Sequence, residues 1–127
     1  MNLNQVTLPS NDIARATAFY RRLGFTQIVD APPRYVRFEC PDGSASFSLH
    51  LVDGAISGPG VVVYFECADL DAAYARIVAL GVSFEAPPTD QPWLWREAYL
   101  RDPDGNLLCL FQAGKNRLHP PWRLVQR

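Results

Sequence analysis

The sequence lacks an excess of charge of either sign. Twelve lysine and arginine residues stand against 13 aspartate and glutamate residues in a chain of 127, so the formal net charge is −1. Such a balance creates no field that would attract nucleic acid or an anionic membrane surface. We therefore expect no nucleic acid and no membrane among the partners, and a small molecule or a second copy of the chain instead.

Closely spaced cysteines and long apolar runs are missing as well. The three cysteines, Cys40, Cys67 and Cys109, lie far apart, and no two of them form a CxxC spacing. An odd number of scattered cysteines in apolar or alternating runs is typical of free thiols in a reducing compartment. No apolar run approaches the roughly 18 residues of a membrane span, and the N-terminus does not resemble a secretion signal. These features predict a cytoplasmic protein.

The sequence does contain an internal repeat. Asp12 and Gly24 flank a segment in which apolar residues recur at helical spacing, and Asp69 and Gly81 flank a second segment of the same kind. An aspartate before such a segment is a typical helix N-cap, and a glycine after it is a typical helix end. Each half also contains a Pro-Asp-Gly triplet between two alternating runs, which indicates a hairpin.

Both halves predict the same order of elements, namely a strand, a helix and three further strands. The strands of the first half are expected at Asn4–Leu8, Phe25–Val29, Arg34–Cys40 and Ser46–Val52, and those of the second at Val61–Cys67, Val82–Glu85, Trp95–Arg101 and Leu107–Phe111. The fold class is therefore α+β, with two βαβββ modules.

A chain of 127 residues fits one domain with a core of its own. We expect a single domain over residues 1–127, with module one at about 3–53 and module two at about 60–112. The Gly-, Ser- and Pro-rich stretch Asp53–Gly60 is the expected linker. Residues 113–127 form a tail whose Trp and Pro content predicts that it packs back on the domain, as a lid or as an arm across a dimer interface.

Each amphipathic helix must cover one face of its sheet, so alternation along the strands sends the other side chains to the opposite, concave face. That face is expected to carry Gln5, Thr7, Ser46, Ser48, His50, Val62, Tyr64, Glu66, Glu97, Tyr99 and Arg101. Such a set is too polar for a dry core. The face is therefore either open to solvent or part of a ligand cavity.

Three segments resemble a known family. They are VTLPSNDIARATAFYRRLGF, YFECADLDAAYARIVALGV and REAYLRDPDGNLLCLF. Over about residues 3 to 112, the chain resembles the glyoxalase, bleomycin-resistance and extradiol-dioxygenase superfamily, also called the vicinal oxygen chelate superfamily. The resemblance implies two βαβββ modules whose curved mixed sheets form a cleft, and it implies a homodimer.

The resemblance also implies where a metal would be held, and the sequence departs from that pattern. Metal enzymes of the superfamily usually take His or Gln from the first strand, His from the fifth and Glu from the last, with a further ligand from the fourth in glyoxalases. The matching positions carry Gln5, Val62, Cys109 and His50. Val62 and Cys109 do not supply the usual oxygen or nitrogen ligands, so we expect the standard metal site to be lost and predict no firm cofactor.

Three residues are the candidates for catalysis, namely His50, Glu66 and Glu97. A histidine held by a carboxylate, or a carboxylate alone, can act as a general base. The same three side chains form the alternative, non-standard site for a divalent metal. The structural alternative is that the two carboxylates pair with Arg37 and Arg101.

The expected ligand-binding residues come from several strands of the concave face. They are Gln5, Thr7, Ser48, Tyr64, Trp95, Tyr99, Arg101 and Cys109. Aromatic rings and hydroxyls suit a small organic ligand, although Tyr64 and Tyr99 would also serve as ordinary filling between sheets. Cys109 has no adjacent base in the sequence and is interpreted as a lining residue rather than a nucleophile.

Two functions compete. The first is a protein that binds a small molecule in a polar cleft without catalysis, which the loss of the usual ligands favours. The alternative is a glyoxalase-like lyase or isomerase acting on a small carbonyl compound, with a metal or an acid–base residue, which the polar cleft favours. A purely structural module is disfavoured because its concave faces would be apolar.

Overall fold

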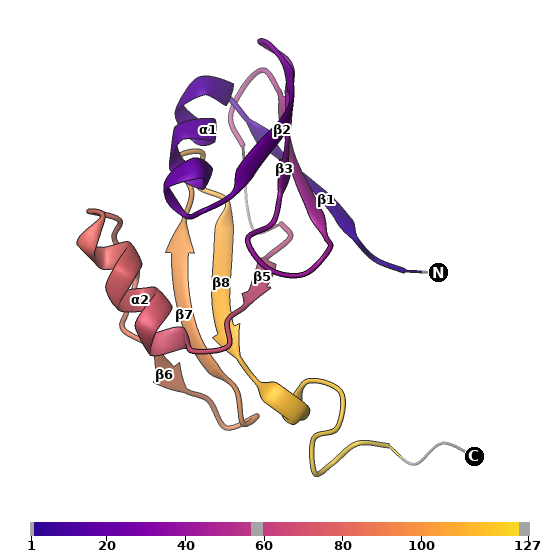
Figure 1. Ribbon diagram of the computed structural model, residues 1–127, viewed down its shortest axis with the longest axis vertical. Helices are drawn as coiled ribbons and strands as arrows, with labels where there is room; N and C mark the ends of the chain where they lie inside the picture. Colours follow the sequence, from indigo (N-terminus) through magenta and orange to yellow (C-terminus); the bar gives the residue numbers. More distant parts are fainter. Residues whose placement is uncertain (1, 57–59, 125–127) are drawn as a thin grey trace. The chain divides into compact units, whose positions relative to one another are not determined.

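The computed structural model describes residues 2–56 and 60–124, so the expected linker at 53–60 lies partly outside the described residues. The chain divides into two compact units (Figure 1). Unit 1 comprises Met1–Val61 with Arg101–Asn106, and unit 2 comprises Val62–Leu100 with Leu107–Arg127. The single-domain organisation of residues 1–127 stays a prediction.

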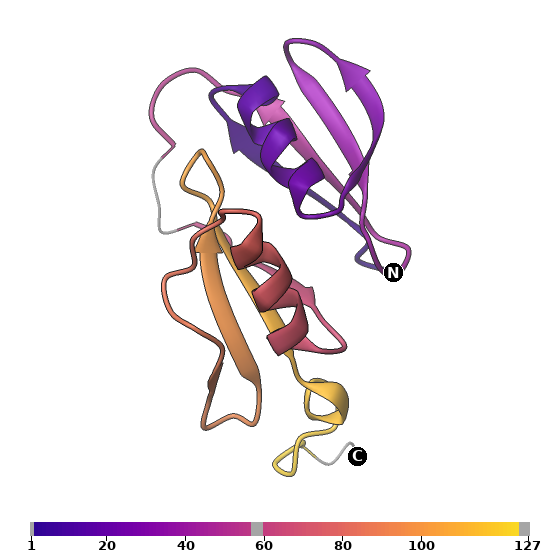
Figure 2. The same ribbon diagram turned by 60° about the vertical axis from the view of Figure 1, so that its left-hand side comes forward.

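Unit 1 is one βαβββ module, as the repeat predicts. Its elements are β1 (Gln5–Ser10), α1 (Ile13–Arg22), β2 (Thr26–Ala31), β3 (Tyr35–Glu39) and β4 (Ser46–Leu51). The sheet order is β1-β4-β3-β2, with β1 parallel to β4 and the remaining pairs antiparallel. Figure 2 shows α1 lying along this sheet.

Helix α1 begins and ends at the residues that the sequence marked. The Asp12 carboxylate accepts a hydrogen bond from the Arg15 backbone N–H at 3.0 Å, which satisfies one of the free amides of the first turn. Gly24 follows the last turn with φ of 101°, a conformation that a side chain disfavours. The residues between them bury one face of the helix.

The core of unit 1 is aromatic. Tyr20 of α1 lies against the rings of Phe47, Phe25 and Phe38, with centroid separations of 4.7, 5.5 and 5.9 Å. Tilted and edge-on ring pairs of this kind each contribute about 0.5–1.5 kcal/mol beyond the burial of their area. This cluster fixes α1 on the sheet.

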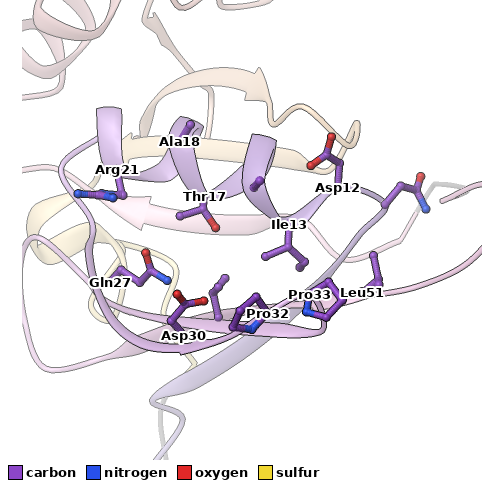
Figure 3. Close-up of a pocket in the computed structure, with 13 residues that line it drawn as sticks. Asp12, Ile13, Thr17, Ala18, Arg21, Gln27, Asp30, Pro32, Pro33 and Leu51 are labelled. Atoms are coloured by element: carbon purple, nitrogen blue, oxygen red, sulfur yellow. The ribbon is translucent and has the colours of Figure 1, made fainter.

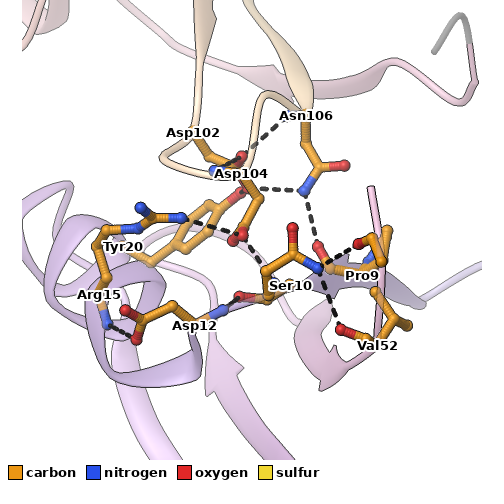
Figure 4. Close-up of polar contacts among 11 residues, drawn as sticks. Pro9, Ser10, Asp12, Arg15, Tyr20, Val52, Asp102, Asp104 and Asn106 are labelled. Carbon is orange, nitrogen blue, oxygen red and sulfur yellow. Dashed lines mark hydrogen bonds and ion pairs between the residues drawn. The ribbon is translucent and has the colours of Figure 1, made fainter. Parts of the chain in front are cut away.

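A turn from the second half of the chain completes unit 1 (Figure 4). The buried Tyr20 hydroxyl donates to Asp102 Oδ2 at 2.7 Å, and Asn106 Nδ2 donates to the Pro9 carbonyl at 3.0 Å. The Asn11 backbone N–H donates to Asp104 Oδ1 at 2.8 Å. The second Pro-Asp-Gly turn is therefore an integral part of unit 1.

Unit 2 repeats the plan. Its elements are β5 (Val63–Glu66), α2 (Leu70–Ala79), β6 (Thr89–Asp90), β7 (Arg96–Arg101), β8 (Leu107–Gln112) and the 3-10 turn η1 (Gly114–Asn116). The sheet order is β5-β8-β7-β6, which is the order of unit 1. The Asp69 carboxylate caps α2 by accepting from the Ala72 N–H at 3.1 Å. Neither α1 nor α2, the helices of the described residues, is long and apolar enough to cross a membrane.

The strand predicted at Val82–Glu85 is wrong. The backbone N–H of Val82 donates to the carbonyl of Ile77 at 3.4 Å, so this residue completes the end of α2 instead of opening a ladder. The strand of this position is β6, which pairs with β7 after the two prolines Pro87 and Pro88. The Glu85 N–H does donate to the Tyr99 carbonyl of β7 at 2.8 Å, but Pro87 and Pro88 lack the N–H that would extend this contact into a continuous ladder.

Candidate functional site

The face of the unit 1 sheet that points away from α1 carries a connected polar network, which consists of Gln5, Thr7, Tyr35, Arg37 and Ser48. The Gln5 side-chain amide donates to Ser48 Oγ at 2.6 Å and to Thr7 Oγ1 at 3.4 Å. Ser48 Oγ and the Tyr35 hydroxyl are 2.6 Å apart, and Arg37 Nε donates to that hydroxyl at 2.9 Å. The structure thus brings Gln5, Thr7 and Ser48 together.

Tyr35 is the member of this network that the sequence analysis missed. Burial raises the pKa of its phenol, but the hydrogen bonds with Ser48 and Arg37 and the charge of Arg37 outweigh burial and lower the pKa below its ordinary value. A signal was available, because Tyr35 and Arg37 are two residues apart on one strand and therefore share a face.

His50 lies on the same face of β4, opposite Tyr35 of β3 and Pro9 of β1. Its side chain is exposed, and the described residues give it no hydrogen-bond partner. An imidazole in this setting has both ring nitrogens available to solvent or to a ligand.

The corresponding face of unit 2 holds a buried carboxylate, Glu97, which is 3% exposed. The Trp93 indole N–H donates to its Oε2 at 3.0 Å, and the Tyr99 hydroxyl donates to its Oε1 at 3.1 Å. Both carboxylate oxygens therefore have a partner, as a buried acidic group requires.

Next to Glu97 the same face is aromatic. Trp95 stacks on Phe111 with ring centroids 4.6 Å apart, and Tyr64 meets both rings edge-on at 6.0 and 5.7 Å. We refer to Tyr64, Trp95 and Phe111 as the aromatic cluster. Tyr64 and Trp93 are each 45% exposed, so ring surface beside the cluster is open to solvent.

Burial makes the remaining titratable groups of this face poor acids. Burial, assisted by the nearby charge of Glu97, raises the pKa of the Cys109 thiol to about 12. The pKa of Tyr99 is also raised, first by burial and then by its interactions with Tyr64, Cys109 and Glu97. Both groups are therefore protonated at neutral pH, so Cys109 is a thiol and not a thiolate.

The first residues of the tail pack on this face. The Trp95 indole N–H donates to the Asn116 carbonyl at 3.3 Å, and Arg117 lies 3.6 Å from Glu66 Oε1 in an exposed ion pair. Arg101 Nη1 donates to the Gly105 carbonyl at 3.0 Å within the Pro-Asp-Gly turn. The two candidate carboxylates of unit 2 are thus partnered locally, Glu66 by the tail and Glu97 by Trp93 and Tyr99.

The candidate metal ligands are distributed over both units, with His50 in unit 1 and Glu66 and Glu97 in unit 2. Within residues 2–56 and 60–124, no three His, Cys, Asp or Glu side chains are grouped so that they could hold a metal ion. Inside unit 2 the donor atoms of Glu97 are engaged by an indole and a phenol, which are not metal ligands in this form.

Both units have the same strand order, and each carries polar or aromatic side chains on the face away from its helix. These features define the class of proteins that contain two βαβββ units. The comparison with protein families specifies this class further. Residues 2–110 match the model of the Glyoxalase/Bleomycin resistance protein/Dioxygenase superfamily. The chain belongs to this superfamily, as the sequence resemblance predicted.

Solved structures agree in fold. A glyoxalase/bleomycin resistance protein/dioxygenase from Nocardioides is 26% identical with a TM-score of 0.80, covering 98% of this chain and 90% of that one. A bleomycin-binding protein complexed with bleomycin is 25% identical with a TM-score of 0.74, covering 88% and 98%. A lactoylglutathione lyase from Agrobacterium tumefaciens is 24% identical with a TM-score of 0.73, covering 87% and 92%. Among curated proteins, no sequence matches.

Proposed function

We propose that this chain is a small-molecule-binding protein whose ligand contacts the aromatic cluster of unit 2. The proposal rests on one observation, namely the hydrogen bonds of Glu97 and the exposed rings beside it. This carboxylate accepts hydrogen bonds on both oxygens from Trp93 and Tyr99, and it lies beside exposed ring surface. These side chains give a ligand ring surface to pack on and polar groups that fix its orientation, but they give it no reactive group.

Catalysis is less well supported by the same side chains. A general base must reach its substrate, and the Glu97 carboxylate is only 3% exposed, with each oxygen already accepting a hydrogen bond. Cys109 is protonated because its pKa is about 12, so no thiolate is available near neutral pH. We also propose that the metal site usual in the superfamily is lost, since Val62 and Cys109 stand at two of its positions.

The proposed ligand is an organic molecule with at least one planar ring system. Trp93 and Tyr64 present ring faces and edges on which such a group can stack. The bleomycin complex of a 25% identical relative makes bleomycin a reasonable first probe. We further propose that the protein works as a cytoplasmic homodimer. The three free cysteines agree with a reducing location.

The experiment is isothermal titration calorimetry with metal-free bleomycin and a panel of planar heteroaromatic compounds in the presence of EDTA. Wild-type protein is expected to bind at least one compound, and Trp93→Leu is expected to weaken that binding about tenfold or more. Trp122→Leu is the matched control, because Trp122 is also exposed, at 56%, but lies in the tail. Equal losses in both variants, or no saturable binding of any compound, would contradict the proposal.

A second candidate function is a metal-dependent or acid–base lyase or isomerase acting on a small carbonyl compound. One observation favours it, namely that His50 has no partner among the described residues and so has a free imidazole. Lactoylglutathione lyase activity, measured with and without added divalent nickel or zinc, tests this candidate. Turnover that His50→Ala abolishes would establish it in place of the binding role.

A further inference from the structure

Unit 1 contains a cavity that lies on the helix side of its sheet (Figure 3). The cavity has a volume of about 660 Å³, and all the residues that line it belong to unit 1. Val36 lines it, whereas the neighbouring residues Tyr35 and Arg37 belong to the polar network. Because alternate residues of a strand point to opposite faces, the cavity is separated from that network by the sheet itself.

The cavity has an apolar part and a polar part. Ile13, Val36 and Leu51 supply apolar surface between α1 and the sheet. Toward the other end, Figure 3 shows Thr17 and Arg21 of α1 facing Gln27 and Asp30 of β2. Ligand pockets typically enclose about 300–1,000 Å³ and combine apolar walls with a few convergent polar groups, which matches this arrangement.

The hydroxyl of Thr17 is the recessed polar group of this cavity. Its Oγ1 is buried and has no hydrogen-bond partner among the described residues. A threonine inside a helix commonly satisfies its hydroxyl by donating to the carbonyl four residues earlier, but Thr17 does not. A buried hydroxyl without a partner is costly, and a ligand that hydrogen-bonds to it, once the side chain turns toward the cavity, would remove the cost.

Two opposite charges stand near this hydroxyl. Arg21 and Asp30 both line the cavity and are exposed, and neither side chain forms a hydrogen bond or ion pair within residues 2–56 and 60–124. An adjoining hollow of about 470 Å³ is also lined by Arg21 and Asp30. One unpaired guanidinium and one unpaired carboxylate at the same end of a cavity complement a ligand that carries both charges.

We propose that this cavity binds a small zwitterion with an apolar body, of which an apolar α-amino acid is the simplest example. The carboxylate of the ligand pairs with Arg21, and its ammonium group pairs with Asp30 and donates to Thr17 Oγ1 after the threonine side chain turns its hydroxyl into the cavity. The apolar side chain of the ligand lies on Ile13 and Val36. This inference is independent of the function proposed for the aromatic cluster.

The test is a titration of ¹⁵N-labelled full-length protein with L-leucine, L-phenylalanine and L-tryptophan, followed by ¹H–¹⁵N correlation spectra. At least one amino acid is expected to bind with a Kd of about 1 mM or tighter, with the largest shifts in α1 and β2. N-acetyl-leucine and leucinamide, which each lack one charge, are the matched ligands and are expected to bind at least about tenfold more weakly than leucine.

Two variants locate the site. Thr17→Val keeps the shape of the side chain and removes the unpartnered hydroxyl, so it is expected to fold with unchanged or higher stability and to weaken binding at least about threefold. Thr89→Val is the control, because Thr89 lies on β6 of unit 2 and outside this cavity. No binding of any of the three amino acids at 10 mM, or binding unaffected by Thr17→Val, would overturn the proposal. Leucinamide binding as tightly as leucine would overturn the requirement for a zwitterion.

Discussion

Cys109 illustrates how its surroundings set the chemistry of a single residue. Its side chain is buried, whereas Cys40 and Cys67 are partly exposed. Burial, together with the charge of Glu97, raises its pKa from 9.0 to about 12. A thiol that ionises at about pH 9 in the unfolded chain but near 12 in the folded one stabilises the fold fully below pH 9. This contribution is lost as the pH rises through 12.

The first prediction follows from this shift. In native protein at pH 8, Ellman's reagent should react with at most two of the three cysteines, because Cys109 is both covered and protonated. The third thiol should react after the protein is unfolded in urea. A third equivalent released from native protein at the rate of the first two would contradict the interpretation of Cys109 as a lining residue.

Glu97 shows which features of the candidate site could be predicted from the sequence. Its place on the concave face was predicted from alternation along its strand, but its partners were not. Arginine partners were one expectation for this carboxylate, whereas the structure provides Trp93 and Tyr99. Trp93 precedes β7, so the direction of its indole depends on the loop conformation and not on strand periodicity.

At the scale of elements, the contact between α1 and the turn Asp102–Asn106 is expected to stabilise unit 1. The Tyr20 hydroxyl donates to Asp102 Oδ2 at 2.7 Å inside a buried site, and the pKa of Tyr20 is raised by burial and by that carboxylate. The phenol therefore remains a donor throughout the ordinary pH range. Without it, Asp102 loses a partner that water cannot readily replace.

The second prediction concerns this contact. Tyr20→Phe should lower the free energy of unfolding by about 1–3 kcal/mol, the usual cost of leaving a buried acceptor short of a donor. Urea denaturation measures this change. Tyr74→Phe is the matched control, since the Tyr74 ring packs on Phe84 at 4.8 Å but its hydroxyl has no partner among the described residues. Equal effects of the two substitutions would show that the hydrogen bond to Asp102 contributes nothing.

Most elements could be predicted from local patterns because local physics determines them. Asp12 and Asp69 cap helices that begin immediately after them, and alternation located β3, β4, β7 and β8 to within a residue or two. The strand after α2 was misplaced because Val82 completes the helix end. The packing of the Asp102–Asn106 turn into unit 1 was not predicted, because that contact joins residues distant in sequence.

At the scale of the whole molecule, the internal repeat provides two similar sheets with different surfaces. On the face away from its helix, unit 1 carries a polar network around Ser48, and unit 2 carries an aromatic cluster beside Glu97. The helix-side cavity of unit 1 could not be predicted from the sequence. It forms where α1 leaves part of the sheet uncovered toward β2, which depends on helix placement and not on residue pattern.

The central claim is that this superfamily member binds an organic ligand without a metal. The most direct measurement is elemental analysis of purified wild-type protein and His50→Ala, before and after incubation with divalent nickel, zinc, iron and manganese. The account predicts no stoichiometric metal in either protein and the same ligand affinity with and without EDTA. One equivalent of metal per chain in the wild type that is lost in His50→Ala would contradict it and favour the lyase or isomerase.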